Sequence, residues 1–122
     1  MKLDFHSELP IYLQITAEME DAIFTGAFPE EAQVPSTTEI SASMQVNPAT
    51  VLKGMNLLVD EGLLYKKRGL GLFVREGAVE KIRKKRQQQF YEKYVVTLVA
   101  EARKLKLTRE EVMKWMERGF AQ

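Results

Sequence analysis

The chain has 122 residues, a length that suits one domain with a small appendage and leaves no room for a large effector-binding domain. Apolar residues make up 45% and charged residues 29% of the sequence, as in soluble folded proteins. There is no cysteine, so thiolate metal sites and disulfides are excluded, and the single histidine, His6, lies near the N-terminus, which argues against histidine catalysis. We therefore expect no enzyme, no cofactor and no metal site.

The N-terminal residues lack the apolar run of a signal peptide, and the longest apolar-rich stretch, residues 94–100, is too short to span a bilayer. We expect a cytoplasmic protein without a membrane partner. Its charge is uneven: residues 1–62 carry two basic and ten acidic residues (net −8), whereas residues 63–122 carry sixteen and seven (net +9). Most of the positive excess lies between Lys66 and Arg86, which indicates an anion-binding surface there.

Apolar side chains recur at steps of four from Ile11 to Ile23, with acidic residues on the other side. This period predicts an amphipathic helix over residues 10–25, ended by Gly26. Residues 28–35 are predicted as a connecting loop, because two prolines bracket a short polar run.

Two further helices follow, joined by about three residues. Ser36 and Glu39 have the spacing of a capping box, which predicts a short helix that ends near Gln45. Asn47 is a suitable N-cap and Pro48 suits the first helical position, so a second helix is predicted from there to about residue 61. The arrangement is typical of a helix-turn-helix.

A basic hairpin is predicted directly after the helix-turn-helix. Residues 63–67 and 72–75 have the composition of strands, and Gly69 and Gly71 between them allow the positive φ angles of a tight turn. The hairpin carries four basic side chains and no acid: Lys66, Lys67, Arg68 and Arg75. A hairpin in this position is interpreted as a wing.

The remaining residues predict two helices. The first covers residues 78–104 and is apolar on two sides in its later part, and the second begins at a capping box, Thr108 to Glu111. Two helices of this size cannot bury both apolar sides alone, so we expect a partner subunit, and hence a homodimer. The residues expected at this interface are Phe90, Tyr91, Tyr94, Val95, Leu98, Val99, Val112, Trp115 and Met116.

An ordered set of short motifs runs from Pro10 to Val74 and covers about half the chain. In chain order it comprises Pro10-Ile11-Tyr12-Leu13-Gln14-Ile15, Gly26, Val34-Pro35-Ser36, Val46-Asn47-Pro48-Ala49-Thr50-Val51, Glu61-Gly62-Leu63-Leu64 and Arg68-Gly69-Leu70-Gly71-Leu72-Phe73-Val74. The set resembles the winged-helix domain of GntR-type regulators. The Val-Asn-Pro-Ala-Thr-Val form and the short remainder are similar to the YtrA subfamily, whose members dimerise through two C-terminal helices.

The resemblance implies a mainly α fold with a small β-hairpin wing. It implies a winged helix-turn-helix DNA-binding domain over residues 1–76 and a helical dimerisation region over residues 77–122. The sequence departs from the family pattern in two places: Thr38 stands where an arginine usually contacts DNA, and Glu30-Glu31 replace a Pro-Gly. Both changes reduce the expected electrostatic attraction to DNA.

Three segments are expected to contact DNA. Together with the expected homodimer, they predict a sequence-specific regulator that binds an inverted-repeat operator. They are the start of the first helix of the motif (Ser36, Thr37, Thr38), the first turns of the recognition helix (Asn47, Pro48, Ala49, Thr50, Lys53) and the wing tip (Lys66, Lys67, Arg68, Gly69).

Plainer interpretations stay open for each segment. The polar residues at the helix starts can be caps alone, and the wing lysines can protect an exposed edge strand from aggregation. The basic run over residues 81–86 is interpreted first as a solvated helix face. An alternative function is a winged-helix module that binds protein or RNA. The regulator is expected to act as a repressor, and a small-molecule effector is left open without assigned residues.

Overall fold

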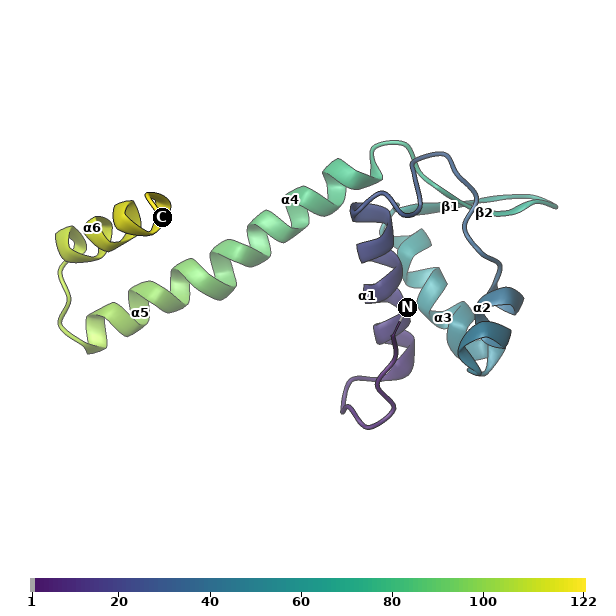
Figure 1. Cartoon of the computed structure of the whole chain (residues 1–122). Coiled ribbons are helices and arrows are strands. Elements are labelled where there is room, and N and C mark those ends of the chain that lie inside the picture. Colours follow the sequence, from purple (N-terminus) through teal and green to yellow (C-terminus); the bar gives the residue numbers. More distant parts are fainter. Residues whose placement is uncertain (1) are drawn as a thin grey trace. The chain divides into compact units, whose positions relative to one another are not determined.

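The computed structural model describes residues 2–122, and Figure 1 shows its helices and hairpin. Residue 1, the first position of the predicted DNA-binding domain, lies outside the described part. In chain order the elements are α1 (Ile11–Phe24), α2 (Thr37–Met44), α3 (Pro48–Asp60), β1 (Leu64–Lys67), β2 (Gly71–Val74), α4 (Ala78–Phe90), the π-helical η1 (Tyr91–Val95), α5 (Val96–Lys104) and α6 (Arg109–Phe120). They form two compact units, the first ending at Arg83 and the second covering Lys84–Gln122. The functional division at residues 76 and 77 stays a prediction.

The core of the first unit lies between α1 and α3. Fully buried apolar side chains come from both helices, and burial of each stabilises the fold by about 1.5–3 kcal/mol: Ile15, Met19, Ile23, Val51, Met55 and Leu58. Gly54 lets the helices approach closely, because a Cβ atom there would lie 2.6 Å from the carbonyl oxygen of Tyr12. The hydroxyl of Thr16 donates a hydrogen bond to the carbonyl oxygen of Gly54 at 2.8 Å. The amphipathic period predicted for α1 is therefore confirmed.

The predicted helix-turn-helix is present with its caps. The Ser36 hydroxyl accepts from the Glu39 N–H at 3.1 Å, and the Glu39 carboxylate accepts from the Ser36 N–H at 3.0 Å. At the start of α3 the side-chain oxygen of Asn47 accepts from the Ala49 N–H at 2.8 Å, and Pro48 occupies the first turn. The sequence predictions for both helix starts are confirmed.

The hairpin pairs β1 and β2 antiparallel, with Lys67 opposite Gly71. Gly69 and Gly71 have φ angles of +79° and +120°, as the predicted turn requires. The segment predicted as a plain loop does more than connect: its backbone runs along β2, where the Val34 N–H donates to Leu72 O at 3.0 Å. This segment covers the outer edge of β2, which would otherwise expose unpaired backbone groups.

The second unit consists of the end of α4, η1, α5 and α6. Helical structure continues without a break from Ala78 to Lys104, as predicted, but the π-helical turn at Tyr91–Val95 was not predicted. The capping box at Thr108 is present, with the Thr108 hydroxyl accepting from the Glu111 N–H at 3.1 Å. Within residues 84–122 no side chain is buried.

The fold class predicted from the sequence, mainly helical with a small antiparallel hairpin, is confirmed. None of the helices over residues 2–122 has the length and apolar character needed to cross a membrane. Across those same residues, the histidine and acidic side chains form no group of three or more that could hold a metal ion.

Candidate nucleic-acid interface

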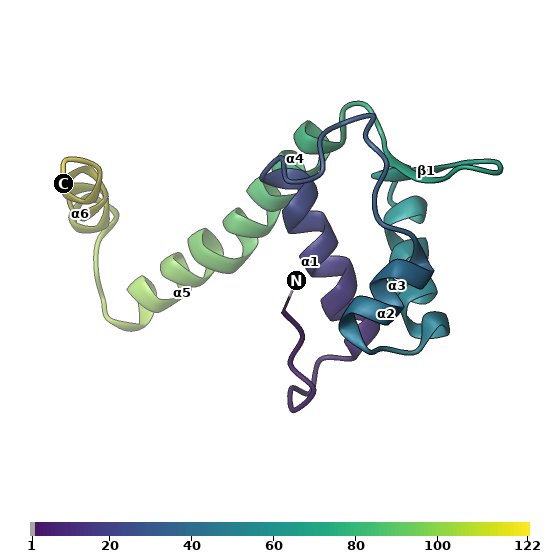
Figure 2. The ribbon, with the colours of Figure 1, turned by 45° about the vertical axis from the view of Figure 1, so that its right-hand side comes forward.

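The three segments predicted to contact DNA all belong to the first unit. In Figures 1 and 2, α2 lies beside α3, and the hairpin projects away from the helices. Most of the predicted contact residues are exposed, and two are half-buried, Thr37 and Thr50. The exposed ones are Ser36, Thr38, Asn47, Pro48, Ala49, Lys53, Lys66, Lys67, Arg68 and Gly69.

The start of α2 is occupied by its own cap. The Ser36 N–H donates a hydrogen bond to the Glu39 carboxylate at 3.0 Å, and this bond, together with one from the Ser36 side chain, lowers the pKa of that carboxyl below its usual value. Glu39 therefore keeps its negative charge beside this helix start, which opposes a phosphate there. Thr37 and Thr38 remain the donors nearest to such a contact, and their role in DNA binding stays a prediction.

The first turns of α3 present short polar side chains and one cation. Asn47 uses its side-chain oxygen as a cap, and its amide group still has two N–H donors. The ammonium of Lys53 lies 4.0 Å from the centre of the Tyr12 ring, so α1 holds this cation by a cation–π contact. Sequence reasoning missed this partner, although Tyr12 stands in one of the recognised motifs.

The wing is braced by aromatic rings and by the preceding loop. The ammonium of Lys67 lies 4.3 Å from the centre of the Phe73 ring, and the Arg75 guanidinium lies 5.4 Å from that of Tyr65. The side-chain amide of Gln33 donates to Leu70 O at 2.6 Å, at the tip of the hairpin. This brace was not predicted, because nothing in the sequence marks Gln33 as a partner of the turn.

Glu30 and Glu31, which were expected to weaken the attraction to DNA, have a structural role. Both carboxylates accept hydrogen bonds from backbone N–H groups at or just before the start of α4. Their negative charges therefore lie beside a helix N-terminus, where the helix dipole is favourable to them.

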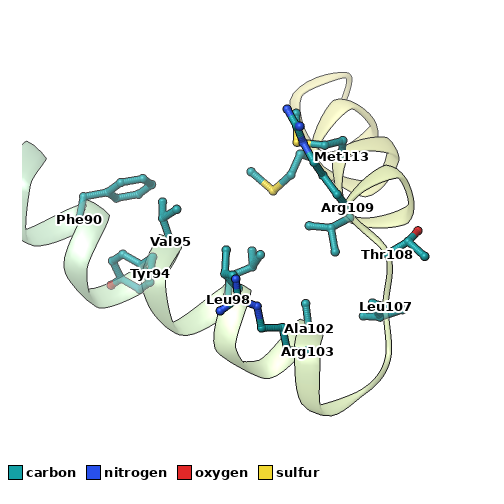
Figure 3. A pocket seen from close by; sticks show the side chains of 13 residues that line it. Phe90, Tyr94, Val95, Leu98, Ala102, Arg103, Leu107, Thr108, Arg109 and Met113 are labelled. Carbon is teal, nitrogen blue, oxygen red and sulfur yellow. The ribbon is translucent and has the colours of Figure 1, made fainter.

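An open groove in the second unit brings together most of the predicted interface residues (Figure 3). It has a volume of about 540 Å³ and lies between η1 with α5 on one side and α6 on the other. Seven of the nine predicted residues line it: Phe90, Tyr94, Val95, Leu98, Val99, Val112 and Met116. Tyr91 and Trp115 lie outside this lining and are about half exposed. Arg103 and Arg109 add charge to an otherwise apolar groove.

Comparisons with known proteins match this architecture. The sequence profile of "Bacterial regulatory proteins, gntR family" matches residues 11–74, which span α1 to β2. The HTH-type transcriptional repressor YtrA of Bacillus subtilis is 32% identical over 78 residues, which are 64% of this chain and 60% of that protein.

Two solved structures are also similar. A GntR family transcriptional regulator from Listeria monocytogenes has a TM-score of 0.72 and 25% identity, covering 93% of this chain and 98% of its own. The structure of AraR(DBD) in complex with operator ORX1 has a TM-score of 0.55 and 32% identity, covering 61% of this chain and 92% of its own. The curated relative named here, YtrA, is a transcriptional repressor, and the chain spans 60% of its length. The chain belongs to the gntR family of bacterial regulatory proteins.

Proposed function

We propose that the protein is a transcription repressor that binds, as a homodimer, an operator made of two inverted half-sites. The observation that carries the proposal is the first unit itself, which exposes the first turns of α3 and a basic wing tip together. AraR(DBD), to which this part of the chain is similar, was solved in complex with its operator. The α3 helix would read base edges in the major groove, and the wing would bind phosphate or enter a minor groove.

Electrostatics favours two DNA-binding units over one. Lys53 is the only lysine or arginine between residues 3 and 65, and the Tyr12 ring draws it toward α1. Glu39 adds negative charge near the start of α2. A single unit therefore attracts phosphates mainly through the wing, so two linked units are needed for tight binding.

The second unit supports a second copy of this chain as the partner. Its helices expose large apolar side chains, with Trp115 at 54% and Phe120 at 87% exposure, and none of residues 84–122 is buried. Exposed apolar surface of this kind is unusual in a monomer and typical of an interface. A two-fold dimer would fill the groove of each protomer with apolar side chains of the other. It would also present two DNA-binding units to an inverted repeat.

Repression then requires only that the dimer occupies a promoter, because a bound dimer blocks the access of polymerase. A small-molecule effector is left open, as in the sequence, without assigned residues.

A gel-shift assay tests the proposal. The probe is a duplex covering the DNA upstream of the protein's own gene, and the competitor is an excess of unrelated duplex. A band that survives competition supports operator binding. A band lost to the competitor contradicts it and favours a module that binds protein or RNA.

A further inference from the structure

We propose that Glu30 and Glu31 are positioning residues that fix how α4 leaves the first unit and so set the spacing between the two half-sites. The inference rests on the proposed function, since half-site spacing has a meaning only for a dimer. The contacts of these two carboxylates with the start of α4 and with the wing are called the α4 joint below.

Glu30 caps α4 from a distant part of the chain. One carboxylate oxygen accepts from the Gly77 N–H at 2.7 Å, and the other accepts from the Val79 N–H at 3.1 Å. The first N–H groups of a helix have no partner inside the helix, and the dipole favours a negative charge beside them. Glu30 therefore holds the first turn of α4 by two charge-assisted hydrogen bonds.

Glu31 ties the same helix start to the wing. One carboxylate oxygen accepts from the Glu76 N–H at 3.1 Å, and the other accepts from the Tyr65 hydroxyl of β1 at 3.0 Å. Its φ angle is +71°, a conformation that is strained for a residue with a side chain and relaxed for glycine. The chain keeps a carboxylate at a position where glycine would suit the backbone better, so the carboxylate has a use that offsets the strain.

The opposite side of the α4 start is also fixed. Ala78 and Ile82 are 1% and 0% exposed and belong to the core of the first unit. The ammonium of Lys81 lies 2.7 Å from the place a Cβ atom would take on Gly62, just beyond the end of α3. The start of α4 is thus held by apolar packing on one side and by the α4 joint on the other.

A small tilt at this start has a large effect at the far end of the helix. The 13 residues of α4 rise ~1.5 Å each, a length of ~20 Å, so a tilt of ~10° displaces the far end by ~3.5 Å. This displacement equals about one base-pair step of ~3.4 Å along DNA. Loss of the α4 joint therefore changes the half-site spacings that a dimer can span.

The decisive test measures spacing preference. The wild-type protein first selects its half-site from a random duplex library, and inverted repeats of that half-site are then made with spacers varied in single base-pair steps. We expect the wild type to bind one spacer length more tightly than its neighbours. In the Glu30→Ala/Glu31→Gly variant, this ratio of affinities should fall by about fivefold or more. Glu8→Ala is the control, since Glu8 is exposed in the segment before α1, far along the chain from the α4 joint. A variant with the wild-type spacer profile would overturn the proposal.

A second measurement needs no DNA. The amides of Gly77 and Val79 should exchange hydrogen about tenfold faster in Glu30→Ala than in the wild type or the Glu8→Ala control. Unchanged exchange of these amides would overturn the proposal that Glu30 holds the start of α4, even if the operator is found. Selection of no inverted repeat by the wild type would instead refute the proposed function, and faster exchange would then still support the joint as a helix anchor.

Discussion

The basic wing tip allows a quantitative test of how the protein attracts DNA. Lys67 and Arg68 are replaced by alanine, separately and together. Each phosphate contact steepens the dependence of log K on log salt concentration by ~0.9, so the double variant should have a slope less steep by ~1.8. Between ~50 and ~200 mM salt, the wild type should then lose ~12-fold more affinity than the double variant.

The structure predicts that these substitutions leave the fold intact. Both side chains are exposed, and the recorded contacts of Lys67 are with the rings of Phe73 and Tyr65, of which the nearer is worth about 0.5–1 kcal/mol. Binding is measured by fluorescence anisotropy over a salt series, with the duplex that survives competition in the gel shift. Lys114→Ala on α6 is the control, because it removes an exposed positive charge of the second unit. An unchanged slope in the double variant would show that the wing tip makes no phosphate contacts.

Three further predictions concern the dimer, the helix contact and the cap. Leu98→Glu places a charge in the groove and should convert a sedimenting dimer to a monomer, and a persistent dimer would contradict the interface. Gly54→Ala should lower the free energy of unfolding in urea by about 1–3 kcal/mol, because its Cβ would meet Tyr12 O at 2.6 Å, and an unchanged midpoint would contradict the close approach. Hydrogen bonds from the Ser36 N–H and hydroxyl lower the pKa of Glu39, so the capping contribution of its carboxylate is present at neutral pH and is lost as the pH falls through that lowered pKa. Glu39→Gln should therefore reduce Tm at pH ~7 and leave Tm unchanged at strongly acidic pH. An equal loss of Tm at both pH values would refute this role of Glu39.

Local rules explain why much of the fold could be predicted. The capping boxes at Ser36 and Thr108, and the Asn-Pro start of α3, depend on residues within one helical turn, so the sequence displays them directly. The two glycines of the wing turn are of the same kind. Periodicity likewise identified the buried face of α1, because a helix repeats its apolar side every three to four residues.

The contacts that were not predicted join residues far apart in the chain. Glu30 and Val79 are separated by 49 positions, and Gln33 and Leu70 by 37, so no local spacing reveals either pair. Glu30 and Glu31 were interpreted from charge alone, and only the fold shows which N–H groups their carboxylates accept from. The π-helical turn at Tyr91–Val95 has no sequence signal of its own here.

The candidate site divides in the same way. The start of α3 and the wing tip could be located from the sequence, because an Asn-Pro cap and two turn glycines mark them. The cation–π contact of Lys53 with Tyr12 could not, since it depends on how α1 crosses α3. Which of these side chains contact DNA stays a prediction.

The stoichiometry of the DNA complex decides whether the protein binds its operator as a dimer. The protein, of 14.0 kDa per chain, is sedimented with a duplex carrying the selected inverted repeat and with a duplex carrying one half-site. We expect two chains on the inverted repeat, bound far more tightly than any chain on the half-site duplex. One chain on the inverted repeat, or equal affinity for both duplexes, would contradict this expectation.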